Sequence, residues 1–228
     1  MDGVDNFPPP RPWALGIFAK APLPGEVKTR LCPPFTPSEA ALFHRLSLTE
    51  TVSRMRGRGF DLVLFHAGPA SFFQRRFPDL PLRSQGEGDL GERMERALGT
   101  LLAGRRGAAL IGADTPDLPP ELVEQAFDRL QTAEVVTAPA SDGGYVLIGE
   151  SRHHPALFRQ IAWGSSEVLA ATRRQAAALG LAYGEVAEWD DVDDLPALRR
   201  LLGRSPTCRA ARFAARLLGR QPPLSNAG

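Results

Sequence analysis

The order of the sequence patterns predicts an α/β domain: a mostly parallel sheet between two layers of helices, a three-layer sandwich. Short apolar segments typical of buried strands alternate with longer amphipathic segments typical of helices. Polar motifs containing glycine or aspartate follow several of the apolar segments directly. Because alternating strands and helices favour parallel pairing, and ligands bind beyond the carboxyl ends of such strands, we expect a binding site along one edge of the sheet.

The predicted elements follow one another with short connections. Residues 13–18 form a short apolar strand, and a loop rich in Gly and Pro follows over 20–34. The segment Thr36-Pro37-Ser38-Glu39 is a capping box with Pro at the first helical position, and it opens a helix to about Arg56. The further predicted strands are 61–66, 108–112, 134–138, 145–148 and 181–187. The further predicted helices are 89–102, 120–130, 166–179, 193–202 and 209–218.

Length and composition favour a single domain. The chain has 228 residues, of which 43% are hydrophobic, and shows no linker between its halves. We expect a domain over 13–220, with a Pro-rich leader at 1–12 and a loose tail at 221–228. A formal net charge of +1 and the lack of interleaved basic and aromatic residues argue against a nucleic-acid partner.

The sequence also argues against a membrane or secreted protein. It contains no apolar stretch of transmembrane length, and its first residues lack the pattern of a secretory signal. Cys32 and Cys208 have no metal-ligand spacing and suggest no disulfide framework. We therefore expect a reduced, cytoplasmic protein with no membrane partner.

The loop after the first strand reads FAKAPLPGEVKTRL and carries three cations, Lys20, Lys28 and Arg30. Gly25 lets the backbone approach a ligand closely. Backbone amides and basic side chains together bind phosphate oxygens well. The loop is therefore a candidate phosphate site, and the alternative is a solvated basic loop.

Acidic residues follow two other predicted strands. IGADTPDLP places Asp114 directly after the strand 108–112, where a hard cation such as Mg²⁺ or Mn²⁺ would find a carboxylate ligand. Asp117 lies near the start of the next helix, so we expect a structural role for it. EWDDVDDL contains four aspartates, Asp190, Asp191, Asp193 and Asp194, which repel one another unless a cation is near. One of the last two is also suited to cap the following helix.

Two glycine-rich motifs remain open to two interpretations. In SDGGYVLIG, Gly143 and Gly144 allow close approach to the backbone, and Asp142 is a candidate base or hydroxyl ligand; the alternative is an Asp-Gly hairpin turn. In QGEGDLGERM, a nucleoside could contact the backbone, whereas Asp89 and Glu92 resemble a capping pair. The glycines of that second motif are Gly86, Gly88 and Gly91.

Aromatic and histidine residues give weaker signals. Trp163 and Trp189 could stack on a base or a sugar, and packing in the core is an equal alternative. His153 and His154 precede a proline, which favours an exposed loop. His66 has no accompanying Ser or Cys motif, so a hydrolase triad is unsupported.

Taken in order, FAKAPLPGEVKTRL, QGEGDLGERM, GADTPDLP, SDGGYVLIG, WGSSEVL and DDVDDL resemble the rSAM/selenodomain-associated transferase family. The resemblance covers about residues 13–202. That family is similar to 2-phospholactate guanylyltransferase and the molybdenum-cofactor nucleotidyltransferases. It implies the GT-A fold of nucleotide-diphospho-sugar transferases and a Mg²⁺ or Mn²⁺ cofactor.

The resemblance also implies roles for individual residues. Lys28 and Arg30 match the basic loop that neutralises nucleotide phosphates. Asp114 matches a metal ligand, and Asp191 or Asp193 matches a second one. The segment 86–91 matches the region near the base, and 142–144 matches the acceptor side. The sequence departs from the family pattern around Trp163, where Ala-Trp-Gly-Ser-Ser replaces Pro-Trp-Ser-Thr-Pro, and before Leu195, where the usual Thr-Pro is missing.

Three functions fit these residues. The resemblance favours glycosyl transfer from a nucleotide-sugar to a small acceptor. The basic loop also fits nucleotidyl transfer from a nucleoside triphosphate to a phosphorylated small molecule, since both reactions neutralise charge on a pyrophosphate. A non-catalytic nucleotide-binding protein is a third possibility. It is disfavoured because Lys28 and Asp114 are both present.

Overall fold

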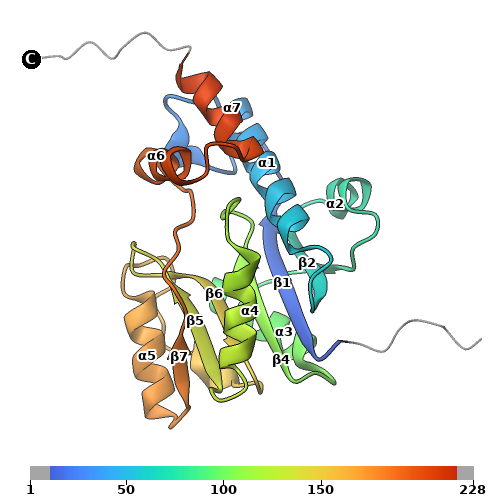
Figure 1. Cartoon of the computed structure of the whole chain (residues 1–228), viewed down its shortest axis with the longest axis vertical. Coiled ribbons are helices and arrows are strands. Elements are labelled where there is room, and N and C mark those ends of the chain that lie inside the picture. The colour runs from blue at the N-terminus through green and yellow to red at the C-terminus, as the bar shows by residue number, and fades with distance from the viewer. Residues whose placement is uncertain (1–10, 220–228) are drawn as a thin grey trace, which may run out of the picture.

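The computed structural model describes residues 11–219 as one α/β domain (Figure 1). Its seven-stranded sheet has the order β3-β2-β1-β4-β6-β5-β7. All strand pairs are parallel except those of β6, which runs antiparallel to β4 and β5. The strands are β1 (Trp13–Lys20), β2 (Asp61–Ala67), β3 (Leu82–Ser84), β4 (Gly107–Gly112), β5 (Val135–Pro139), β6 (Tyr145–Glu150) and β7 (Tyr183–Glu185).

Helices cover both faces of this sheet, so the predicted three-layer GT-A-type sandwich is confirmed. One face packs against α1, α2 and α4 through a large apolar cluster. The other packs against α3, α5 and η2 through a second cluster. The helices are α1 (Pro37–Met55), α2 (Ala70–Arg76), α3 (Leu90–Leu102), α4 (Pro120–Arg129), α5 (Val168–Ala178), α6 (Leu195–Arg204) and α7 (Arg209–Leu218), with the 3₁₀ turns η1 (Thr29–Leu31) and η2 (Pro155–Phe158).

Side-chain caps fix where several helices begin. The predicted capping box at the start of α1 is present, with Thr36 and Glu39 bonded reciprocally to each other's backbone amides. Asp89 and Glu92 form a second box at the start of α3. Asp194 caps α6 by accepting a bond from the amide of Ala197 at 2.8 Å. Each such cap stabilises a helix by about 1 kcal/mol.

The structure adds elements that the sequence analysis did not predict. Helix α2 and the short strand β3 lie in a stretch that was left unassigned. The predicted strand at 181–187 is reduced to β7, and the residues after it form a long loop to α6. Residues 1–10 of the predicted leader and all of the predicted tail lie outside the described residues. No helix within 11–219 is long and apolar enough to cross a membrane.

A third apolar cluster holds the two ends of the domain together. It joins η1 and α1 to α6 and α7, which lie side by side at the top of Figure 1. Leu31, Phe43, Leu198 and Leu201 are fully buried in it. Because the loop before α6 is anchored by this cluster, its aspartates are brought to the carboxyl edge of β1 and β4.

Candidate functional site

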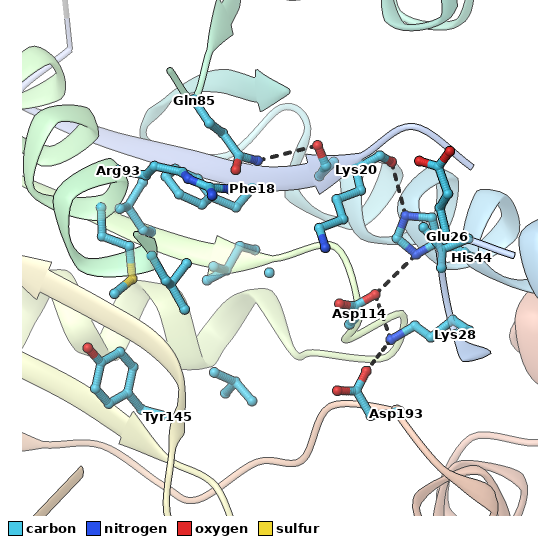
Figure 2. A pocket seen from close by; sticks show the side chains of 18 of the residues that line it. Phe18, Lys20, Glu26, Lys28, His44, Gln85, Arg93, Asp114, Tyr145 and Asp193 are labelled. Carbon is cyan, nitrogen blue, oxygen red and sulfur yellow. Dashed lines mark hydrogen bonds and ion pairs between the residues drawn. The ribbon is translucent and has the colours of Figure 1, made fainter. Parts of the chain in front are cut away.

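A cavity of about 630 Å³ opens at the carboxyl edge of the sheet. It lies where β1 and β4 end and where β6 begins, and residues of α1 and α3 complete its wall. Figure 2 shows Lys28, Asp114 and Asp193 together at one end, and Phe18, Tyr145 and Arg93 toward the other. Of the sequence-predicted site residues, those lining the cavity are Lys20, Lys28, Arg30, Asp114 and Asp193.

The centre of the charged end is the side chain of Lys28. Its Nζ lies 2.7 Å from Oδ1 of Asp114 and 2.6 Å from Oδ1 of Asp193 (Figure 2). The lysine side chain is only 3% exposed, whereas the two aspartates are 35% and 50% exposed. The ammonium therefore faces the carboxylates, and each carboxylate keeps part of its surface on the cavity.

His44 is a second support for Asp114, and the sequence analysis did not predict it. Its Nδ1 lies 3.2 Å from Oδ1 of Asp114, and its Nε2 lies 3.1 Å from the carbonyl oxygen of Lys20. Both neighbours accept hydrogen bonds, so both bonds form together only when both ring nitrogens donate. His44 thus ties α1 to the end of β1 and fixes the orientation of the Asp114 carboxylate.

The charges at this end stabilise one another. Burial opposes the charged form of Lys28, but the two carboxylates outweigh it and raise the pKa of the ammonium above its usual value. Burial also opposes the charged form of Asp114. Lys28 and His44 reverse that effect and hold the pKa of Asp114 well below its usual range. Asp114 is therefore ionised throughout the physiological range.

The four aspartates before α6 have four different environments. Asp193 contacts Lys28, Asp194 caps α6, and Asp190 pairs with Arg200 at 2.9 Å. Burial and the nearby charge of Asp193 raise the pKa of Asp191 to about 7. Of the two alternatives for a second metal ligand, only Asp193 lines the cavity.

Asp117 has the structural role expected for it, although through a partner other than the helix dipole. Its side chain is fully buried and accepts bonds from Arg204 Nε at 2.5 Å and Nη2 at 3.0 Å. The indole nitrogen of Trp189 lies 3.3 Å from its Oδ1, and Arg204 stacks over the ring of Trp189. Asp117 thus links the start of α4 to the end of α6.

Of the other predicted residues in the loop after β1, Lys20 and Arg30 line the cavity and Gly25 does not. Lys20 and Arg30 are exposed and reach the cavity, so their charges are available to an anionic ligand. Gly25 is exposed with a φ of 83°, a left-handed conformation that glycine adopts without strain. It does not line the cavity, although it sits in the same loop.

The predicted site residues of the segment 86–91 do not line the cavity, but Leu90 within the segment and Gln85 before it do. Gly86 and Gly88 have positive φ, and Asp89 caps α3, as the alternative interpretation held. Gly91 is buried against the indole of Trp163, where a Cβ would come within 2.3 Å of the ring nitrogen. Trp163 also stacks on Phe158, so its contacts are those of a core residue.

The segment 142–144 forms the turn between β5 and β6. Asp142 accepts a bond from the amide of Gly144 at 2.9 Å, as in an Asp-Gly hairpin. Gly143 has a φ of 88° and lies against the backbone of Ser166. None of these three residues lines the cavity.

Several further cavity residues lie within the two glycine-rich motifs, but their side chains were not predicted as site residues. Gln85 is buried, and its amide nitrogen donates to the carbonyl oxygens of Ala19 and Phe65, so its orientation is fixed. Arg93 and Tyr145 also line the cavity. Most of the apolar lining comes from three strands and α3, and it includes Phe18, Leu90, Met94, Leu110 and Ile148.

A divalent metal fits the donor chemistry at the charged end. Asp114 and Asp193 both contact the ammonium of Lys28, so their carboxylates lie close together. Carboxylate oxygens are the ligands that Mg²⁺ and Mn²⁺ prefer. Within residues 11–219, no group of three or more His, Cys, Asp or Glu side chains is arranged as a complete metal site. Two carboxylates completed by water and substrate phosphate are the usual arrangement for Mg²⁺.

Solved structures share this fold. A protein from Desulfovibrio desulfuricans G20, proposed to be a nucleotide-diphospho-sugar transferase, is 28% identical, with a TM-score of 0.85 and coverage of 92% of this chain and 96% of that one. Rv0371c of Mycobacterium tuberculosis H37Rv, solved with manganese, is 18% identical, with a TM-score of 0.51 and coverage of 84% and 98%. The 4-diphosphocytidyl-2C-methyl-D-erythritol synthase of Anaerococcus prevotii DSM 20548 is 9% identical, with a TM-score of 0.57 and coverage of 90% and 99%.

The sequence comparisons are more limited. No curated protein matches this sequence significantly. A family match covers residues 51–165, just over half of the chain, from the end of α1 to the loop before α5. That segment includes Asp114, Gln85 and the start of α3. The chain belongs to the family described as "Uncharacterized protein conserved in bacteria (DUF2064)".

Proposed function

We propose that this chain is a metal-dependent transferase that takes its donor from a nucleotide-activated substrate. The reaction we favour is glycosyl transfer from a nucleotide-sugar to a small acceptor. The observation that carries the proposal is the convergence of Asp114 and Asp193 on Lys28 in a cavity that Lys20 and Arg30 also line. The similarity to the Desulfovibrio protein supports the donor class.

The charged end of the cavity suits a pyrophosphate. Asp114 and Asp193 would hold Mg²⁺ or Mn²⁺, which supplies charge neutralisation at the phosphates. Lys20 and Arg30 would contact phosphate oxygens that point away from the carboxylates. The nucleoside would then lie toward Gln85 and Arg93.

In the favoured reaction, a hydroxyl oxygen of the acceptor forms a bond to the anomeric carbon while the bond from that carbon to the phosphate oxygen breaks, and the hydroxyl proton passes to the departing diphosphate. A nucleoside diphosphate leaves with the electron pair. The two exposed cations of the loop stabilise its added negative charge. We place the acceptor toward Tyr145, at the end of the cavity opposite Lys20 (Figure 2).

Nucleotidyl transfer is the second candidate, and the position of the basic loop favours it. Lys20 ends β1, and both it and Arg30 are exposed, as suits the release of a free pyrophosphate. In that reaction a phosphate oxygen of the acceptor attacks the α-phosphorus of a nucleoside triphosphate, and pyrophosphate leaves. The same cavity serves both reactions, and the ligand preference separates them.

A thermal-shift screen tests the proposal without knowledge of the acceptor. Purified protein would be heated with nucleotide-sugars, nucleoside diphosphates and triphosphates, each with and without Mn²⁺. A ligand at a hundredfold excess over its Kd adds about 2.7 kcal/mol, which raises the Tm of a domain this size by about 5–10 °C. We expect a nucleotide-sugar or diphosphate to give the largest shift, and only with metal.

The outcomes separate the candidates. A preference for triphosphates would move the conclusion to nucleotidyl transfer. A ligand that shifts the Tm equally with and without Mn²⁺ would remove the metal from the proposal. No shift with any nucleotide would contradict the proposed donor class.

A further inference from the structure

Lys28 has an unusual backbone for a lysine. Its φ of 52° and ψ of 36° lie in the left-handed region, which residues with a Cβ rarely adopt. Strained backbone of this kind persists where the surrounding structure requires it, often at functional sites. Here the side chain is buried against Asp114 and Asp193, whereas Lys20 and Arg30 are exposed.

The choice of lysine at this position is also unusual. The chain has 27 basic residues besides histidine, and only Lys20 and Lys28 among them are lysines. An arginine has a broad planar head, whereas the ammonium of lysine is a compact point charge. Such a head suits a position between two carboxylate oxygens at 2.6 and 2.7 Å.

Both carboxylates would also hold the metal, so the ammonium and the metal have the same partners. Charges at contact distance with little solvent between them interact strongly. An ammonium on both ligands neutralises one of their two negative charges and opposes the entry of a divalent cation. A phosphate offers the ammonium another anionic partner and adds oxygen ligands for the metal.

We propose that Lys28 is a resident cation that competes with the divalent metal for Asp114 and Asp193, so that metal binds tightly only together with the nucleotide. The inference rests on the proposed function, since it assumes a metal at these carboxylates. It assigns Lys28 the regulation of metal entry, in addition to phosphate binding. By linkage, the metal strengthens nucleotide binding by the same factor as the nucleotide strengthens metal binding.

Electron paramagnetic resonance of free Mn²⁺ measures metal binding without nucleotide and without turnover. Lys28→Met removes the charge and keeps most of the side-chain length. We expect it to bind Mn²⁺ at least tenfold more tightly than the wild type. Arg56→Met removes one ion-paired positive charge at the other end of the sheet, and its Mn²⁺ affinity should stay within twofold of the wild type.

A second measurement uses the wild type, in case Lys28→Met fails to fold. An amine-acylating reagent followed by mass spectrometry reports on the chain's two lysines separately. We expect Lys20 to be labelled and Lys28 protected without metal, since Lys28 is 3% exposed. With Mn²⁺ bound, labelling of Lys28 should rise several-fold.

The results distinguish this inference from the proposed function. If Lys28→Met binds Mn²⁺ no more tightly than the wild type, and Lys28 stays protected in the metal-bound protein, Lys28 is a brace and the inference fails alone. If neither protein binds Mn²⁺ even with a nucleotide present, both the proposed metal site and the inference about Lys28 are wrong.

Discussion

Asp114 and Asp117 stand three residues apart in GADTPDLP, and each pairs with a cation, yet their surroundings differ. Asp117 is fully buried, and Arg204 and Trp189 together donate three bonds to it. Asp114 is 35% exposed, and both of its contacts, from Lys28 and His44, fall on Oδ1. A carboxylate whose hydrogen-bonding capacity is filled by protein holds the fold together. One with an oxygen left toward a cavity can bind a ligand.

The largest expected effect is on stability, at Asp117, whose carboxylate is fully buried. Asp117→Ala removes the fully buried carboxylate of the pair and leaves Arg204 with the carbonyl oxygen of Asp190 as its hydrogen-bond acceptor. Breaking a buried pair costs about 3–5 kcal/mol. Urea unfolding followed by circular dichroism measures the change. Asp79→Ala, which removes the exposed partner of Arg56, is the control, with an expected cost below about 1 kcal/mol. Equal losses of unfolding free energy in the two variants would contradict a structural role for Asp117.

The next effect is on ligand binding, at Asp114, whose carboxylate is partly exposed. Asp114→Asn keeps the shape but removes the charge, and we expect Mn²⁺-dependent nucleotide affinity to fall at least hundredfold, about 2.7 kcal/mol. Unfolding free energy should change less than in Asp117→Ala. Isothermal titration calorimetry with the nucleotide found by the screen gives the affinity. An unchanged Kd would exclude Asp114 as a metal ligand.

Glu150 is another fully buried carboxylate, and its partner is a histidine side chain. His153 Nδ1 lies 3.3 Å from Oε2 of Glu150. Burial outweighs the bonds from His153 and His154 and raises the pKa of Glu150 to about 7 from 4.5. The folded protein then keeps a proton that the unfolded chain releases between these values, so stability is lost as pH rises through this window.

Glu150→Gln should remove that dependence. At pH 8 we expect the variant to be more stable than the wild type by about 2 kcal/mol, and at pH 4 the two should be nearly equal. Unfolding free energies at pH 4, 6 and 8 measure the difference. A difference that does not vary with pH would show that folding leaves the pKa of Glu150 unshifted. The nearby Glu95, paired with His153 at 2.7 Å, is unchanged in both proteins.

The smallest expected effect is at Asp142, which lies in a surface turn. Asp142→Ala loses the bond to the amide of Gly144, worth about 1 kcal/mol. Nucleotide affinity should stay within twofold, since the residue does not line the cavity. Calorimetry measures this. Loss of turnover with normal nucleotide affinity would support the predicted acceptor-side role, whereas loss of nucleotide affinity would place the hairpin at the donor site.

The sequence predicted elements with strong local signals and missed weak ones. The capping boxes before α1 and α3 follow from residues three apart, and both are present. Strand β3 has only three residues, two of them polar, so the alternation of apolar and polar residues that predicts a strand cannot be recognised in it. The predicted exposed position of His153 and His154 is wrong. Both are partly buried, because contacts with Glu95 and Glu134 come from distant parts of the chain.

The same reasoning applies to the site. Lys28 and Asp193 are 165 residues apart, and the cluster that joins η1 to α6 brings them together, so no local pattern shows their contact. His44 had a weak signal, a lone histidine among the apolar positions of a helix. On α1, Leu42 and Leu46 are only partly buried, while His44 and Leu48 are buried.

The most direct test of the metal–nucleotide site is anomalous diffraction from crystals grown with Mn²⁺ and the nucleotide selected by the thermal-shift screen. We expect a manganese peak about 2.0–2.3 Å from carboxylate oxygens of both Asp114 and Asp193, with nucleotide phosphates as further ligands. A nucleotide bound elsewhere, or one bound in the cavity with Lys28 still bridging both aspartates and no manganese beside them, would contradict it.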